Sequence, residues 1–153
     1  MIRAYLDTEF TVLNSYIYKL ISLALVVPSG PEFYVELTDA WEECDCSDFV
    51  KEIVLPQLDL KVHGRDTVQA RMRLLDFLMG LGPVEIICDA PAWDWPLLLR
   101  LVGPEGLPAN VTAGRISSDL EFSYDGAEPP HHALEDARLL ADILENRDLP
   151  RSA

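Results

Sequence analysis

Three runs that favour β-strands fall within the first forty of this chain's 153 residues, ahead of any clear helical pattern. They cover residues 2–8, 18–27 and 33–37. In the first run apolar side chains alternate with polar ones, as expected of a strand near the middle of a sheet. A Pro-Ser-Gly-Pro turn at residues 28–31 joins the other two runs, so residues 16–38 are predicted to form a hairpin. A chain that begins this way must arrange its later segments around a sheet.

Helical patterns and one more strand follow the hairpin. Residues 84–88 form an apolar run that is predicted to be a buried strand. Residues 105–130 contain several glycines and prolines and leave room for one further strand. Four helices are expected from capping and stop signals. The first is short, capped by Ser47 or Asp48, and ends before Pro56, and the second is opened by the capping box of Asp66 and Gln69 and stopped at Gly80. The third begins with Asp94 and Pro96 and runs through residue 101, and the fourth covers residues 133–146.

This order of strands and helices predicts an α/β fold with a mixed five-stranded sheet flanked by helices. We expect a single domain over residues 1–146 and a flexible C-terminal tail over residues 147–153. In sheets of this class, ligands bind at the carboxyl ends of the strands, near a point where the strand order reverses. The side chains at the predicted strand ends are therefore the first place to look for chemistry.

Acidic side chains occupy two of these strand ends. Asp7 and Glu9 end the first strand, and Asp89 and Asp94 follow the buried strand at residues 84–88. Asp7 and Glu9 are two residues apart, so both point to the same face of the strand. Two carboxylates placed together repel each other unless a cation lies between them, and Mg²⁺ prefers oxygen ligands of this kind. The two acidic groups would converge on one edge if the two strands are neighbours.

Each acid also has an ordinary structural interpretation. Asp7 and Glu9 could lie on the solvated face of an edge strand. Asp94 precedes Trp95 and Pro96 and would make a good helix N-cap. Asp136 falls near the start of the last predicted helix, where the helix dipole stabilises an anion by about 0.3–1 kcal/mol. Taken singly, each of these residues is explained without function.

The charge of the chain restricts its partners. Twelve basic and 26 acidic residues give a net charge of −14, and such a surface does not attract long duplexes. It favours a small substrate, a short oligomer, or a site where metal ions supply positive charge. Three cysteines, an odd number, indicate a reducing environment, so we expect a cytoplasmic protein. The longest apolar run, residues 20–28, falls far short of the roughly 20 residues that span a bilayer, and no membrane association is expected.

Three segments of the sequence resemble the motifs of a known enzyme family. Residues 7–11 read Asp-Thr-Glu-Phe-Thr, residues 92–94 read Ala-Trp-Asp, and residues 131–137 read His-His-Ala-Leu-Glu-Asp-Ala. In this order they are similar to the three motifs of the DEDDh 3′→5′ exonucleases, the last of which is His-x-Ala-x-x-Asp. The closest resemblance is to small stand-alone bacterial exoribonucleases whose first motif reads Asp-Thr-Glu-Phe. The resemblance spans nearly the whole chain and implies a ribonuclease H-like fold.

The resemblance also implies a centre with two divalent cations, Mg²⁺ or Mn²⁺. Asp7, Glu9 and Asp136 would bind one ion. Asp7 would also bind the second ion, which Asp94 would hold directly or through water. His131 would be the general base for the attacking water, and a histidine that titrates near neutral pH suits that task.

Further residues take roles from the same resemblance. His132 occupies the variable position of the third motif and is expected to be ordinary. Phe10 and Thr11 would lie beside the terminal nucleotide, and Leu13 falls where relatives place an apolar wedge against the base. The chain departs from many relatives at residues 89–90, where it has Asp-Ala in place of His-Asn. The basic patch that some relatives use for nucleic acid is not evident in the sequence.

The predicted function is RNA processing, by removal of 5′-nucleotides from the 3′ end of short single-stranded RNA. Two metal ions roughly 4 Å apart suit that hydrolysis, because they activate water and stabilise the departing oxyanion. Two alternatives stay open: a 3′→5′ exodeoxyribonuclease, and a non-catalytic nucleotide-binding module on the same fold. Such a module has no need of four carboxylates and a histidine, which weighs against it. The resemblance further implies a homodimer.

Overall fold

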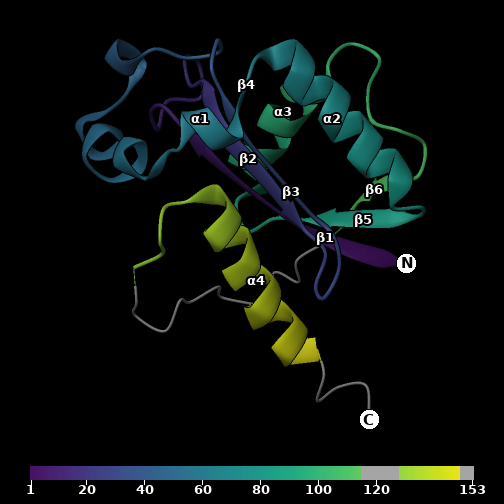
Figure 1. Ribbon diagram of the computed structural model, residues 1–153. Helices are drawn as coiled ribbons and strands as arrows, with labels where there is room; N and C mark the ends of the chain where they lie inside the picture. Colours follow the sequence, from purple (N-terminus) through teal and green to yellow (C-terminus); the bar gives the residue numbers. More distant parts are fainter. Residues whose placement is uncertain (115–127, 149–153) are drawn as a thin grey trace.

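The fold is built on a twisted mixed sheet, seen in a computed structural model that describes residues 1–114 and 128–148 (Figure 1). Within these residues the sheet has six strands in the order β4-β3-β2-β1-β5-β6. The strands are β1 (Ile2–Phe10), β2 (Leu20–Val26), β3 (Glu32–Leu37), β4 (Gly64–Arg65), β5 (Val84–Ile87) and β6 (Val111–Ala113). The first three pair antiparallel, whereas β5 pairs parallel with β1 on one side and β6 on the other. The predicted hairpin and mixed α/β architecture are confirmed.

The sheet has one strand more than the five that the sequence predicts. The additional strand is β4, whose two residues pair parallel with Glu36 and Leu37 at the edge of the sheet. Two residues are too few to produce a periodic pattern, so only pairing with β3 identifies this strand. The strand expected somewhere within residues 105–130 is β6, which extends the opposite edge.

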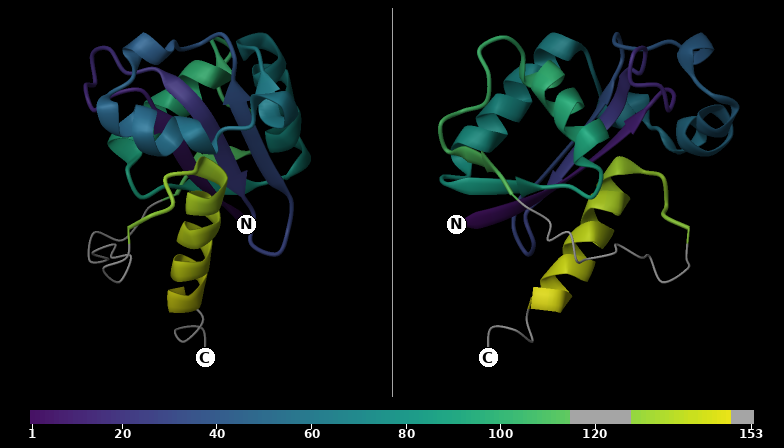
Figure 2. Two further views of the ribbon diagram at one scale, coloured as in Figure 1. Left: turned by 60° about the vertical axis from the view of Figure 1, so that its left-hand side comes forward. Right: turned by 180° about the vertical axis from the view of Figure 1, so that it is seen from behind.

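Helices cover both faces of the sheet, as the two views of Figure 2 also show. The helices are α1 (Leu60–His63), α2 (Thr67–Gly80), α3 (Pro91–Val102) and α4 (Ala133–Asp148). Side chains of β1 alternate between two apolar clusters: Ala4 and Leu6 pack with α2 and α3, whereas Tyr5 packs with α4. Because Asp7 and Glu9 continue the register of Tyr5, both lie on the face that α4 covers.

Two helix boundaries differ from the prediction. The helix α3 begins at Pro91, three residues before the expected start. Proline suits the first helical position, because an amide hydrogen there would have no hydrogen-bond partner within the helix and proline has none. Asp94 therefore lies inside the first turn and is not the N-cap. The short helix after Ser47 also runs past Pro56, through η2 (Val50–Val54) and η3 (Leu55–Gln57). Proline is tolerated there because it occupies the first turn of η3.

The other helix signals are confirmed. The Ser47 hydroxyl accepts a hydrogen bond from the Val50 amide, and the capping box of Asp66 and Gln69 opens α2. The helix α4 ends at Asp148, two residues beyond the expected end, and residues 149–153 of the predicted tail lie outside the described residues. One further short turn, η1 (Glu43–Asp45), lies between β3 and η2.

The apolar residues of α2 divide into two stripes. Ala70, Leu74 and Leu78 are buried, whereas Val68, Met72 and Met79 are exposed. The helix therefore carries more apolar surface than the sheet covers. Among the described residues, no helix combines the length and the apolar character needed to cross a membrane.

Candidate metal centre

The carboxyl ends of β1 and β5 lie side by side. The two strands run parallel with Tyr5 opposite Ile87, so Asp7 and Asp89 each come two residues beyond the last paired position. Two chain segments that are about eighty residues apart in the sequence thus present carboxylates at one edge. The expectation that the two acidic groups converge is confirmed, because β1 and β5 are neighbours.

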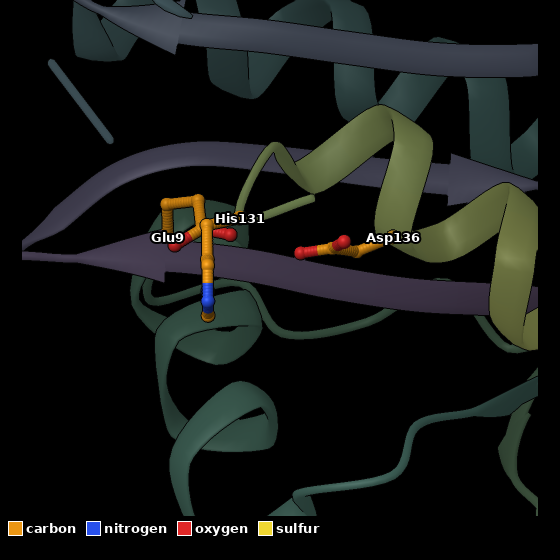
Figure 3. Close-up of side chains that lie close together, drawn as sticks. All are labelled: Glu9, His131 and Asp136. Atoms are coloured by element: carbon orange, nitrogen blue, oxygen red, sulfur yellow. The ribbon is translucent and has the colours of Figure 1, made fainter. Parts of the chain in front are cut away.

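Two groups of side chains gather at this edge, and either could hold a metal ion. Glu9, His131 and Asp136 offer ligand atoms that all lie within 4.8 Å of one another, as do Asp7, Asp89 and Asp94. Figure 3 shows the first group: Glu9 projects from β1, Asp136 from the first turn of α4, and His131 from the segment just before that helix. All five residues that the sequence assigns to the centre therefore lie in one of these two clusters.

Several carboxylate oxygens in these clusters are buried without a hydrogen-bond partner among the described residues. The side chain of Asp94 is 2% exposed, and its Oδ1 accepts a hydrogen bond of 2.6 Å from the Thr8 hydroxyl. Its other oxygen, Oδ2, has no partner, and the same holds for Oδ2 of Asp7 and Oδ1 of Asp136. A buried polar atom without a partner is costly, and a bound cation would offset that cost for these oxygens.

Burial and crowding make these carboxyl groups weak acids. Burial raises the pKa of Asp7 well above its usual value, and the charges of Asp94 and Glu9 raise it further. The pKa of Asp94 is raised to about 7, mainly by burial, and the hydrogen bond from Thr8 opposes that shift. The pKa values of Glu9 and Asp136 are also raised, chiefly by burial. A divalent cation would favour the ionised forms and reverse these shifts.

Asp7 belongs to the second group but also interacts electrostatically with the first. The charges of Asp94, Glu9 and Asp136 all act on its carboxyl group. The sequence assigns Asp7 to both ions, and this position is compatible with that assignment. The resemblance gives His131 no role as a metal ligand, yet in the structure a ring nitrogen of His131 lies within 4.8 Å of carboxylate oxygens of Glu9 and Asp136.

The two adjacent histidines have different surroundings. His131 packs its ring edge-on against Phe49 at 4.9 Å, and its Nε2 lies 3.8 Å from the Glu128 carboxylate, beyond hydrogen-bond distance. His132 instead turns to the sheet, where its ring lies 5.0 Å from that of Tyr34. Burial lowers the pKa of His132 below its usual value. His131 is therefore the one that reaches the carboxylates.

Asp89 is a member of the second cluster that the sequence analysis did not assign to the site. Its signal was present, because it is the first residue after the buried strand that the sequence predicts over residues 84–88. The resemblance pointed away from it, since many relatives have His-Asn at residues 89–90. Its carboxylate adds to the charge that raises the pKa of Asp94.

The predicted substrate contacts lie at the end of β1 and in the loop that follows. Phe10 stacks on Trp93 with a ring separation of 5.5 Å and meets the edge of Tyr18 at 5.3 Å. Leu13 is 78% exposed and free to meet a base. The Thr11 side chain is fully buried, and its hydroxyl accepts a hydrogen bond from the Lys19 amide. Thr11 therefore supports the β1–β2 loop from inside.

The arginines that could build a nucleic-acid groove are partly engaged elsewhere. Arg71 donates to the carbonyls of Leu101 and Arg100 at the end of α3, and Arg65 donates to the carbonyl of Gly64. Arg115 lies outside the described residues. Arg100 donates to the carbonyl of Tyr18 and lies 4.7 Å above the Tyr18 ring, which packs against Phe10.

Comparison with known proteins adds a structural neighbour. No protein-family model and no curated protein sequence matches the chain. Among solved structures, the chain is similar to cell-death related nuclease 4 (CRN-4), with a TM-score of 0.57 and 16% sequence identity. The similarity covers 98% of this chain and 64% of that one, so the chain spans less than two thirds of its neighbour's length. At this identity the comparison establishes a shared fold, and the predicted α/β class of a mixed sheet flanked by helices is confirmed.

Proposed function

We propose that the chain is a metal-dependent 3′→5′ exonuclease that hydrolyses phosphodiester bonds. The observation that supports this best is the pair of acidic clusters with three buried, unpartnered carboxylate oxygens from Asp7, Asp94 and Asp136. A purely structural role would leave such oxygens hydrogen-bonded. The fold shared with a nuclease is compatible with the proposal.

The donor set fits two hard divalent cations, Mg²⁺ or Mn²⁺. Every carboxylate at the centre offers oxygen, the ligand that these ions prefer. Glu9 and Asp136, together with Asp7, would hold one ion, and Asp7 and Asp94 would hold the other. When bound, the two ions supply a Lewis acid for the phosphate and stabilise charge on the attacking and departing oxygens.

The chain's own residues would position the substrate and move the proton. His131, which is not a proposed ligand, would take the proton of the attacking water through its imidazole nitrogen. Its position beside Glu9 and Asp136, at the proposed metal centre, fits that role. Leu13 would contact the terminal base. Phe10, which stacks on Trp93, would lie beside the terminal nucleotide.

We infer that the substrate is short single-stranded RNA and the product a nucleoside monophosphate. A net charge of −14 gives little attraction for a long polyanion, so the last few nucleotides and the metal ions must supply the affinity. DNA as substrate keeps the same chemistry, and a nucleotide-binding module without turnover is the remaining alternative.

The test is incubation of a 5′-labelled RNA oligomer with Mg²⁺ or Mn²⁺, beside the same sequence as DNA. A ladder that shortens stepwise supports an exonuclease, and its relative rate on the two oligomers assigns the sugar. EDTA and the Asp7→Asn variant should each abolish the ladder. Intact RNA together with tight nucleoside monophosphate binding would instead mean a binding module.

A cytoplasmic location and a homodimer remain proposals. All three cysteines, Cys44, Cys46 and Cys88, are free, which is compatible with a reducing compartment. The oligomeric state can be measured by analytical ultracentrifugation. A single species at the monomer mass across the concentration range would contradict the dimer.

A further inference from the structure

His131 has a backbone conformation that is uncommon for residues other than glycine. Its φ is 57°, in the left-handed region that disfavours side chains with a Cβ atom. Such a conformation persists only where the surrounding structure imposes it. The His131 side chain lies close to Glu9 and Asp136 (Figure 3), so whatever imposes this backbone conformation also helps to set the position of the proposed base.

Gln57 is bonded to both peptide groups that define this conformation. Its Nε2 donates to the carbonyl of Pro130 at 2.9 Å and to that of His131 at 3.3 Å, as well as to the carbonyl of Ile53 at 2.8 Å. The first carbonyl belongs to the peptide group before the Cα atom of His131, and the second to the one after it. Fixing the orientation of both groups restricts φ and ψ of His131 together. All three partners are acceptors, so the amide nitrogen must be the group that faces them.

A hydrogen bond to Glu36 on β3 anchors the segment that carries Gln57. Glu36 on β3 is fully buried, and its Oε1 accepts a hydrogen bond of 2.7 Å from the Asp59 amide, two residues after Gln57. Its Oε2 accepts from the Tyr34 hydroxyl, whose oxygen lies 3.3 Å from Nε2 of His132. One buried carboxylate thus holds both the end of the Gln57 segment and, through Tyr34, the residue that follows His131.

We propose that Gln57 is a positioning residue that holds His131 in its left-handed conformation over the carboxylates, from a segment anchored by Glu36. The proposal rests on the proposed function in assigning His131 as the general base. The hydrogen bonds that Gln57 makes among the described residues all go to backbone carbonyls, so it would act on His131 through the two carbonyls. It is also exposed, so its substitution removes hydrogen bonds without opening a cavity in the core.

The experiment compares Gln57→Glu with Gln69→Glu. Both substitutions replace an exposed amide by a carboxylate, but only the first removes donors from the Pro130 and His131 carbonyls. Gln69 lies in the capping box of α2, where glutamate serves equally well. Two quantities are measured for each variant: the steady-state constants kcat and KM, and the imidazole NMR signals of the three histidines, with those of His131 assigned from a His131→Ala variant. Urea unfolding verifies that each variant is folded.

We expect Gln57→Glu to lower kcat about tenfold or more with little change in KM, since a small misplacement of a reacting group is costly. The His131 signals should move or broaden, those of His63 should not, and Gln69→Glu should match the wild type in every respect. Unchanged kcat and unchanged His131 signals in Gln57→Glu would overturn the proposal, as would equal changes in Gln69→Glu. Gln57→Ala repeats the measurement should Gln57→Glu fail to fold. A wild-type chain without nuclease activity contradicts the proposed function, while the His131 signals still decide whether Gln57 holds the ring.

Discussion

The Thr8 hydroxyl donates a hydrogen bond of 2.6 Å to Oδ1 of Asp94, joining β1 to the first turn of α3. Thr8 points to the face of the sheet opposite Asp7 and Glu9, yet it holds Asp94, whose carboxylate belongs to the same cluster as Asp7 and Asp89. The bond occupies one oxygen of Asp94 and leaves Oδ2 buried and directed at the centre without a partner among the described residues. One strand therefore supplies two carboxylates and, from its other face, the group that orients a third.

The first prediction follows from this bond. Thr8→Val keeps the shape of the side chain but removes the donor, so Asp94 should lose its fixed orientation. Partners of metal ligands typically contribute 10–100-fold in affinity, and we expect a loss of about that size for Mn²⁺. Isothermal titration calorimetry measures it, with Thr112→Val on the exposed strand β6 as the control. Equal Mn²⁺ affinity in Thr8→Val and wild type would show that the bond does not orient a ligand.

The second prediction concerns the carboxylate of Asp7. Asp7→Asn should reduce hydrolysis by about 10³-fold or more, since a Lewis acid is worth several kcal/mol and each 1.4 kcal/mol is a factor of ten. The variant should fold, and its metal-free form should be more resistant to urea than wild type because one of several repelling acids has become neutral. A folded Asp7→Asn with wild-type turnover would refute the two-metal assignment.

The third prediction is a pH dependence of stability in the absence of metal. The pKa of Asp94 is about 7 in the folded protein against an ordinary value of 3.8, so between these values the folded state binds more protons than the unfolded state. The free energy of unfolding should therefore fall as the pH rises through this window. Urea midpoints in EDTA at several pH values measure the slope.

Two comparisons identify Asp94 as a source of that slope. Asp94→Asn should flatten it, whereas Asp76→Asn, which removes an exposed carboxylate on α2, should leave it unchanged. Saturating Mg²⁺ should reverse the trend, because the ion binds the deprotonated carboxylates. A stability that rises over the same window in EDTA would mean that the raised pKa is wrong.

The fourth prediction separates the two adjacent histidines. His131→Ala should lower kcat by about 10²–10⁴-fold, the range typical of a lost general base, while Mn²⁺ binding survives. His132→Ala should be comparatively mild, since His132 contacts Tyr34 rather than the carboxylates of the centre. Single-turnover rates measure the loss of activity in each variant, and calorimetry measures its Mn²⁺ affinity. If the two variants rank the other way, the third motif has been read in the wrong register.

The fifth prediction concerns salt. Binding to single strands weakens with a logarithmic slope of about −0.7 per neutralised phosphate. Arg71 and Arg65 already donate to backbone carbonyls, so we expect few phosphate contacts, a shallow slope, and little gain in affinity beyond a few nucleotides. Dissociation constants of the His131→Ala variant with Mg²⁺, measured with oligomers of increasing length, provide the test. A slope that steepens with length would reveal a basic groove and contradict this prediction.

Local sequence determined most of the elements and one half of the centre. Alternation along β1 placed Asp7 and Glu9 on one face, and the Asp66 capping box fixed the start of α2. These features depend on neighbours within a few residues, so a pattern in the sequence is enough to predict them. The start of α4 and the position of Asp136 in its first turn follow for the same reason.

The tertiary structure alone decided which of these elements meet. Parallel pairing of β1 with β5 brings Asp89 and Asp94 to Asp7, and the packing of α4 on the opposite face from α2 and α3 brings His131 and Asp136 to Glu9. The two-residue strand β4 and the left-handed conformation of His131 also exist only through contacts with distant segments. Such contacts depend on strand order and on the side chains that meet across the sheet, and periodicity along the chain does not encode either of them.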